Sequence, residues 1–285
     1  MPSERELRRR VRSVKNIQQV TKAMQLVAAS RMRRAQQSVL ASRPFEEKLR
    51  TVLNDLAPYA DPEVSPLLAR REVKRVAIVL VTTDRGLVGS LNVNLTRAAL
   101  RFAQGQPAAS FIGVGRKGVA TIRRLRLPLV AEFTNLGDRP TTADTNVIAR
   151  VAQQEFLNGN VDEVYLAFTK FVNTLRQTPE IRRLLPLVPE EEDIDELPPL
   201  QYLFEPDAES VLNVVLPRLI EVSVYQSVLE SQASEQSARM VAMRNATDAA
   251  TDLIDEITLA ANKARQGRIT KEMLEIASGA EALKG

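Results

Sequence analysis

Residues 212–264 read LNVVLPRLIEVSVYQSVLESQASEQSARMVAMRNATDAATDLIDEITLAANKA and carry apolar side chains at regular intervals. The intervals alternate strictly between three and four residues, and thirteen of the sixteen positions are apolar or Ala. That pattern is typical of the seam of a coiled coil, which is narrower than the apolar face of an ordinary globular helix. The seam positions are Leu212, Val215, Leu219, Val222, Gln226, Leu229, Ala233, Gln236, Met240, Met243, Thr247, Ala250, Ile254, Ile257, Ala261 and Ala264.

The predicted helix is unusually long. Asp207 follows Pro206 and is a suitable N-cap, and no glycine interrupts the run before Gly267. At 1.5 Å per residue, roughly 60 helical residues extend about 90 Å, several times the diameter of a small domain. We therefore expect the helix to protrude as a stiff rod. Because much of the seam is Ala or Thr, a partner helix can approach closely and the pair would be slender.

A second long helix is predicted at the N-terminus. Ser3 and Glu6 form a capping-box pattern, and Pro58 and Pro62 end a helix of roughly 50 residues, about 75 Å. We expect the two terminal helices to pair as a long antiparallel coiled coil. The apolar stripe of the N-terminal helix is predicted to contain Leu7, Val11, Val14, Ile17, Thr21, Met24, Ala28, Met32, Ala35 and Val39.

The central part of the chain has the pattern of an α/β domain. Short β-rich runs alternate with helical stretches, which indicates a mostly parallel sheet. Strands are expected at 73–81, 108–114, 128–133 and 161–171, with 181–189 as a possible fifth, and helices at 91–103, 117–125 and 141–158. The predicted fold class is thus α/β, with an inserted α/β domain between the terminal helices. The expected domains are 1–57, 58–206 and 207–285.

Composition excludes several kinds of chemistry. The chain has 44% hydrophobic residues, enough for a core, but no Cys and no His. Disulfides, thiol catalysis, imidazole bases and the commonest transition-metal ligands are therefore absent. The longest uninterrupted apolar run, Val76–Val81, is far too short to span a membrane. We expect a cytosolic chain, or one attached to a membrane through its partners.

Charge is distributed unevenly. Residues 1–50 contain thirteen Lys or Arg and four acids, whereas residues 186–209 contain nine acids and no base. Solvated surfaces explain both runs, but the basic stretch also suits acidic partners, either nucleic acid or acidic protein loops. The acidic run Glu190–Glu196 lies among prolines without the glycine of a metal-binding loop, which favours a linker over a divalent-metal site.

Two glycine-bearing turns occupy positions where a doubly wound fold can bind a nucleotide. Residues 82–92 read TTDRGLVGSLN and match neither the dinucleotide pattern nor the P-loop, since the Lys-Ser/Thr ending is missing. Gly113, Gly115 and Gly118 match GxGxxG after a predicted strand, but the helix that follows is short and Glu132 only loosely supplies the expected acid. Structural turns are favoured at both places, and we expect no bound cofactor, no metal and no ATP hydrolysis.

Nine segments, at the two ends and in the centre of the chain, match one known family in order. They are Ser13–Asn16, Thr21–Met24, Val27–Ser30, Asp84–Leu87, Tyr202–Asp207, Ala233–Gln236, Arg239–Asp248, Asn262–Gln266 and Ile269–Glu272. By these segments the chain resembles the γ subunit of F-type ATP synthases, and the resemblance covers nearly its whole length. Val88 and Ser90 stand where the family often has Cys and Gly, which weakens any argument for chemistry at that turn. The cysteine-bearing insertion of the chloroplast form is absent.

The resemblance implies a non-catalytic rotor shaft inside a ring of three α and three β subunits. The α/β domain would sit with the ε subunit on the c ring, at the cytoplasmic face of a bacterial membrane. Contacts with the β subunits would involve Met24, Arg239, Arg265, Gln266, Thr270 and Glu272. Contacts with ε and the c ring would involve Tyr202, Phe204 and Glu205. Each of these residues is equally compatible with an ordinary exposed coiled-coil position.

Beyond Gly267 the coiled-coil spacing is lost and apolar residues spread around the helix. The N-terminal helix is expected to be too short to cover them, so an apolar sleeve of α and β subunits would hold this tip as a bearing. The bearing residues are predicted to be Ile269, Met273, Leu274, Ile276 and Leu283.

Three other classes of protein remain as alternatives. A nucleotide-dependent enzyme lacks its phosphate-binding Lys. A nucleic-acid-binding protein would use the basic N-terminal helix, which has no stacking aromatic residues. A static coiled-coil scaffold shares every pattern described above.

Overall fold

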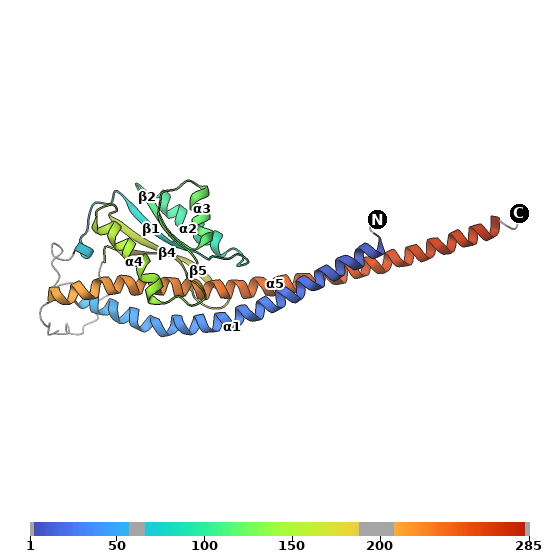
Figure 1. Ribbon diagram of the computed structural model, residues 1–285, viewed down its shortest axis with the longest axis horizontal. Coiled ribbons are helices and arrows are strands. Elements are labelled where there is room, and N and C mark those ends of the chain that lie inside the picture. Colours follow the sequence, from blue (N-terminus) through green and yellow to red (C-terminus); the bar gives the residue numbers. More distant parts are fainter. Residues whose placement is uncertain (1–2, 57–65, 188–207, 283–285) are drawn as a thin grey trace. The chain divides into compact units, whose positions relative to one another are not determined.

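The computed structural model describes residues 3–56, 66–187 and 208–282 (Figure 1). Two compact units are present, one formed by residues 28–239 and the other by residues 1–27 and 240–285. The elements, in chain order, are α1 (Glu4–Leu56), η2 (Pro66–Leu68), β1 (Val76–Val81), α2 (Leu91–Gln104), β2 (Ala109–Val114), α3 (Arg116–Arg124), β3 (Leu129–Phe133), α4 (Thr142–Leu157), β4 (Glu163–Phe171), β5 (Gln177–Leu185) and α5 (Ala208–Ala282).

The larger unit is built on a five-stranded sheet in the order β3-β2-β1-β4-β5. The first four strands are parallel, and β5 is antiparallel to β4 at one edge. Strand β1 is buried along its whole length, as expected for a central strand covered on both faces. The predicted mostly parallel α/β domain is confirmed.

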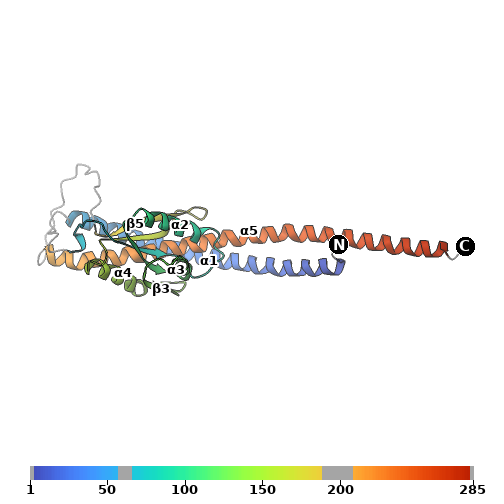
Figure 2. The same ribbon diagram turned by 90° about the horizontal axis from the view of Figure 1, so that it is seen from above.

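The two faces of the sheet carry different helices. One face packs against α2 and α3 through a small core that includes Ile78, Leu95 and Ile122. The other face packs against α4 and the first part of α5 through a larger core that includes Val79 and Leu216. Figure 2 shows α5 running beside the sheet. The α/β core thus needs residues from α5, far along the chain.

Within the larger unit, α5 is buried on almost every side. Apolar positions such as Leu219 and Val224 face the sheet, and Leu229 and Ala233 pack against Ala35 of α1. Of the residues from 219 to 239, none is classed as exposed. A window of α5 is long and apolar enough to cross a membrane by composition, but 56% of it is buried inside the protein. Its apolar residues therefore serve the core.

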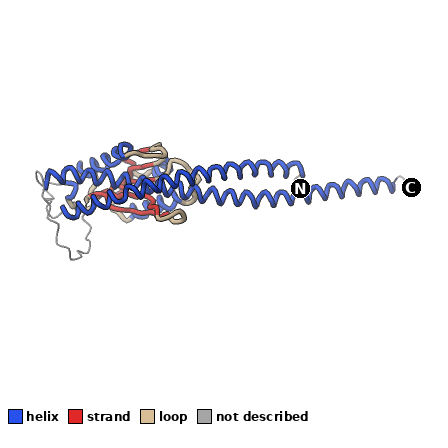
Figure 3. Tube along the Cα trace, turned by 90° about the horizontal axis from the view of Figure 1, so that it is seen from below, coloured by secondary structure: helices blue, strands red, loops and turns tan. Residues whose placement is uncertain are grey.

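The smaller unit is a two-helix antiparallel coiled coil. Thr21 Oγ1 lies 2.8 Å from Thr247 Oγ1, and Gln18 Nε2 donates to Thr251 Oγ1 at 2.7 Å. An ion pair of 3.1 Å joins Arg268 to Glu4. From Thr21 back to Glu4 the residue numbers fall along α1 while those of their partners rise from Thr247 to Arg268, so the two helices run in opposite directions. Figure 3 shows the two helices side by side in this unit. The predicted antiparallel pairing of the terminal helices is confirmed.

The seam predicted in α5 is confirmed along its whole length, since all sixteen positions are buried or half-buried. In α1 one predicted position is wrong. Ile17 is 54% exposed, and Gln18 takes the seam position through its bond to Thr251. Apolarity alone selected Ile17, whereas the spacing of three and four residues after Val14 places residue 18 in the seam.

Two details of the predicted elements differ from the structure. Strand β5 begins at Gln177, four residues before the predicted start, because it forms a hairpin with β4 and its polar first half lies at the sheet edge. Helix α5 continues through Gly267 without a break, as expected. The N-terminal capping box is half formed: Ser3 Oγ accepts from Glu6 N, but the Glu6 carboxylate pairs with Arg10. The predicted N-cap Asp207 and the acidic run 190–196 lie outside the described residues.

Candidate functional site

The turn after β1 occupies the place where a nucleotide would bind in a doubly wound fold. Its carboxylate, Asp84, accepts hydrogen bonds from Arg116 N at 3.0 Å and from Asn135 N at 2.9 Å. The Arg116 guanidinium lies 3.7 Å from the same carboxylate. Asn92 closes the turn through its side-chain amide, whose Oδ1 accepts from Thr83 N and whose Nδ2 donates to Thr83 Oγ1. Asp84 therefore joins the ends of three neighbouring strands.

The N-terminus of α3, a potential phosphate site, is already occupied by the chain itself. Lys117 N donates to Thr83 O at 3.1 Å, and Gly118 N donates to Thr82 Oγ1 at 2.8 Å. Together with Arg116 N, which donates to Asp84, the first amides of α3 all have protein acceptors. A phosphate would have to displace the Asp84 carboxylate, which takes the anion's position at this helix end.

The GxGxxG glycines are required by packing. A Cβ on Gly113 would lie 2.6 Å from the Val119 side chain. On Gly118 it would lie 2.7 Å from Thr82 Oγ1, and on Gly115, at φ +86, it would lie 2.1 Å from the Thr82 carbonyl oxygen. In each case the space beside the glycine is filled by the protein. This geometry agrees with the prediction that both glycine-bearing turns are structural and do not bind a nucleotide.

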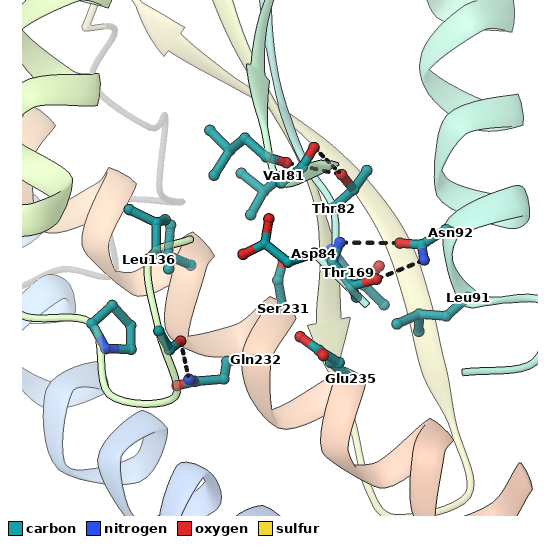
Figure 4. Close-up of a pocket in the computed structure, with 16 residues that line it drawn as sticks. Val81, Thr82, Asp84, Leu91, Asn92, Leu136, Thr169, Ser231, Gln232 and Glu235 are labelled. Carbon is teal, nitrogen blue, oxygen red and sulfur yellow. Dashed lines mark hydrogen bonds between the residues drawn. The ribbon is translucent and has the colours of Figure 1, made fainter. Parts of the chain in front are cut away.

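A small cavity with both polar and apolar lining residues lies between this turn and α5. Its volume is about 50 Å³, enough for a water molecule and far too small for a nucleotide. Asp84 from the turn after β1 and Glu235 from α5 both line it, as Figure 4 shows. Among the residues that the structure describes, no three Asp, Glu, His or Cys side chains group together as a metal site. The cavity carries no arrangement for bond chemistry.

Glu235 is the titratable group with the most unusual environment in this region. Burial raises its pKa, and the neighbouring Asp84 and Asp138 carboxylates raise it further. Arg239 opposes the shift through an ion pair of 2.6 Å and also donates to Gly86 O at 3.4 Å. Glu235 and Arg239 thereby fasten α5 to the turn that contains Asp84.

Replacing Glu235 with Gln is expected to alter the pH dependence of stability. The raised pKa means that the folded state binds the proton more tightly than the unfolded state, where a Glu titrates near 4.5. The wild-type chain should therefore lose stability relative to Glu235→Gln as the pH rises from below 4.5 through the higher pKa of the folded state. Melting temperatures of both chains between about pH 4 and pH 7 measure this. A wild-type advantage that grows with pH would contradict it.

The residues predicted to contact β subunits lie in different surroundings. Met24 is half-buried. Arg239 is 8% exposed and bonded within the chain, so its guanidinium faces the α/β unit. The other four are exposed on α5: Arg265, Gln266, Thr270 and Glu272. The Thr270 hydroxyl donates to Gln266 O at 3.0 Å, and Glu272 lies 3.7 Å from Arg268.

The predicted bearing residues are exposed where the structure describes them. Ile269 is 45% exposed, Met273 65%, Leu274 62% and Ile276 73%. Leu283, and the predicted ε and c-ring contacts Tyr202, Phe204 and Glu205, lie outside the described residues. Helix α5 continues to Ala282, about 20 Å beyond the Arg268–Glu4 ion pair at the start of α1.

Sequence reasoning missed the ion pairs that join α1 to the sheet and to α5. Glu230 is 4% exposed and accepts from the Arg43 guanidinium at 2.7 Å and from Phe171 N at 2.8 Å. Arg182 of β5 donates to Glu46 of α1 at 2.9 Å. These partners are far apart in the chain, and no local pattern links them. The one hint in the sequence is a charged residue next to an apolar seam position, such as Glu230 beside Leu229, because a charge placed there needs a partner.

The fold defines a class of protein: a stalk of two antiparallel helices with an α/β domain whose glycine-bearing turns are filled by the chain itself. A protein family described as ATP synthase matches residues 3–283. The ATP synthase gamma chain of Dehalococcoides mccartyi is 50% identical over 99% of this chain and 100% of its own length. That of Moorella thermoacetica is 46% identical, with both chains covered completely.

Solved structures agree. A chain in the central stalk and c-ring structure of the Tetrahymena thermophila mitochondrial ATP synthase is 27% identical, with a TM-score of 0.63, over 80% of this chain and 99% of the other. A chain from the Euglena gracilis mitochondrial ATP synthase has the same fold, with a TM-score of 0.70 at 21% identity over 98% of this chain and 94% of the other. The chain therefore belongs to the family of ATP synthase gamma chains, the central rotor stalk of F-type ATP synthases.

Proposed function

We propose that this chain is the rotating shaft that couples ion-driven rotation of a c ring to conformational change and ATP synthesis at β subunits. Its partners would be three α and three β subunits, one ε subunit and the c ring, on the cytoplasmic face of a bacterial membrane. The shaft itself would perform no bond chemistry. Family membership supports this proposal, and so does the N-terminus of α3, where the amides of Arg116 and Gly118 already donate to Asp84 and Thr82 of the chain itself.

The observation that carries the proposal is the end of α5. From Ile269 to Ile276 large apolar side chains are exposed on a single helix that has passed the start of α1. An exposed apolar surface of this kind is usually covered by a partner. A sleeve of α and β subunits would cover it and hold the axis, while imposing no strong angular preference. Torque would then act on the part of the shaft before this C-terminal tip, around Met24, Arg265 and Gln266.

The proposed contacts have different accessibilities. Arg265, Gln266, Thr270 and Glu272 are exposed and can meet a β subunit directly. Arg239 is less accessible, because its guanidinium is bonded to Glu235 and Gly86. Any contact it makes with a β subunit would lie beside the turn that contains Gly86. Tyr202, Phe204 and Glu205 remain proposed contacts of the ε subunit and the c ring. The division into domains 1–57, 58–206 and 207–285 likewise remains a proposal.

Shortening the tip should show that the residues that support the axis differ from the residues that transmit torque. Deleting residues 277–285 is expected to weaken assembly and to lower coupled ATP synthesis severalfold, because the axis loses part of its support. Rotation should remain, since the torque contacts are intact. Single-molecule rotation and ATP synthesis in the reconstituted complex measure both. Alanine at Arg265 and Gln266 should reduce torque, while Glu256→Ala, also exposed on α5, serves as the control.

The opposite pattern would contradict the proposal. If the deletion abolished all rotation in an otherwise intact complex, and substitutions at Met24, Arg265 and Gln266 changed nothing, the tip would be the torque contact. A complex in which this chain stays fixed while ATP is made would instead support a static scaffold.

A further inference from the structure

A groove runs between α2 and α3 on the face of the sheet opposite α4 and α5. Its volume is about 660 Å³, and its lining runs from the turn at Gly86 to Gln104 at the end of α2. None of the fifteen residues that line it is acidic. The groove belongs entirely to the unit formed by residues 28–239. It opens on the other side of the turn from the cavity between Asp84 and Glu235, and Asn92 is the residue that lines both.

Four cations line the groove in two rows. Arg97 and Arg101 are one turn apart on α2, and Lys117 and Arg124 are two turns apart on α3. All four are exposed, and no ion pair or side-chain hydrogen bond is recorded for them within the described residues. Facing rows of like charge repel each other, and an acidic partner would relieve that repulsion.

Exposed apolar side chains lie between and beside the cations. Leu87 is 61% exposed, Val93 55% and Leu125 47%, and all three line the groove. Leu87 also has φ 63, in the left-handed region that a non-glycine residue rarely adopts. The bonds between Asn92 and Thr83 hold this turn in place. A strained backbone that displays a leucine is a feature found at binding sites more often than elsewhere.

We propose that the α2–α3 groove is the docking site for an acidic amphipathic helix of a partner protein. The part of α2 that lines it, from Val93 to Gln104, is about 18 Å long, which matches roughly three turns of a docked helix. The docked helix would place an apolar stripe along Leu87, Val93 and Leu125. Acidic residues on both flanks of that stripe would meet the two rows of cations, as in other helix-in-groove complexes.

Other anionic partners fit the groove less well. Its lining contains no Phe, Tyr or Trp, so it offers no aromatic platform on which the bases of single-stranded nucleic acid could stack. A bilayer surface is flat on this scale and would meet the outer edges of α2 and α3, leaving the apolar side chains of the groove uncovered. An acidic helix satisfies the cations and the apolar side chains together.

The test uses the purified full-length chain and a fluorescein-labelled peptide of about 18 residues, with Leu in a single helical stripe and Glu on both flanks. We expect saturable binding, measured by fluorescence anisotropy, that weakens as salt is added. The double substitution Arg97→Glu with Arg101→Glu should lower the affinity about tenfold or more. Arg139→Glu with Arg150→Glu makes the same change in net charge on exposed residues outside the groove and should leave the affinity within about twofold.

A second variant tests the apolar contact. Asn adopts the left-handed conformation more readily than Leu, so Leu87→Asn should melt at the same or a higher temperature while it binds the peptide more weakly. A loss of binding is then not a loss of fold. The proposal is overturned if the peptide does not bind, if a scrambled peptide of equal composition binds as well, or if charge reversal outside the groove weakens binding equally. Tighter binding to phosphatidylglycerol vesicles or to an oligothymidylate would also overturn it.

Discussion

The Gly115→Ala chain is expected to lose about 4 kcal/mol or more of its free energy of unfolding, which would leave little of it folded. The new methyl carbon would lie 2.1 Å from the carbonyl oxygen of Thr82 and 2.7 Å from its carbonyl carbon. Both are backbone atoms at the carboxyl end of β1, so no side-chain rotation can relieve the overlap. Separation of β1 from β2 would break the centre of the sheet. Urea unfolding followed by circular dichroism measures the loss.

Gly137→Ala is the matched control for this experiment. Gly137 has φ +79, close to the value at Gly115, but a methyl group there would meet nothing within 4 Å. Its cost should be about 1–2 kcal/mol, the price of the left-handed backbone alone. The difference between the two variants isolates the overlap with Thr82. Equal losses would show that backbone conformation, and not close packing, is the reason for glycine at position 115.

Glu230→Ala is expected to destabilise the chain by about 3 kcal/mol. The Glu230 carboxylate accepts bonds from Arg43, Gln226 and Phe171 N, and its side chain is 6% exposed. Alanine would leave a backbone amide and part of a guanidinium without acceptors in a buried place. Because Arg43 is 34% exposed, water can reach part of its guanidinium and limit the loss. Thermal and urea unfolding of the purified chain measure the effect.

Two companion variants separate the charge from the hydrogen bonds. Glu230→Gln keeps an oxygen that can accept from Phe171 N and should lose less stability than Glu230→Ala. Glu256→Ala removes a carboxylate from an exposed position of the same helix and should change stability by less than about 0.5 kcal/mol. If Glu230→Ala were as mild as Glu256→Ala, the buried pair would contribute nothing to joining α1, α5 and the sheet.

Periodicity made most of the fold predictable. The seam of α5 needs only the alternation of three and four residues, because every partner position follows from helix geometry. The four parallel strands were predictable because buried runs such as Val76–Val81 have few polar residues and alternate with helices. The polar first half of β5 was not, since a strand at the edge of a sheet is selected by its hairpin with β4. Ile17 was misplaced because apolarity was weighted above spacing.

The candidate site was less predictable. The sequence shows glycines at 113, 115 and 118 but does not show whether a ligand or the chain itself fills the space beside them. That depends on Thr82, which is brought there by the pairing of β1 with β2. The ion pairs of Glu230 with Arg43 and of Glu46 with Arg182 depend on tertiary packing in the same way. Four of the six proposed β-subunit contacts, Arg265, Gln266, Thr270 and Glu272, are exposed residues, and neither seam spacing nor burial distinguishes these four from ordinary surface.

The contribution of α5 to the core of the sheet has a consequence for synthesis on the ribosome. One sheet face, with Ala77, Val79 and Leu166, packs against Leu212 and Leu216 of α5. The strands are all translated before that helix, so a nascent chain that has just completed β5 exposes an apolar surface. At about 5–20 residues per second, α5 follows within seconds, plus the time needed to leave the exit tunnel. During that interval the nascent chain is open to chaperones and to aggregation, until a helix translated after all five strands closes the core.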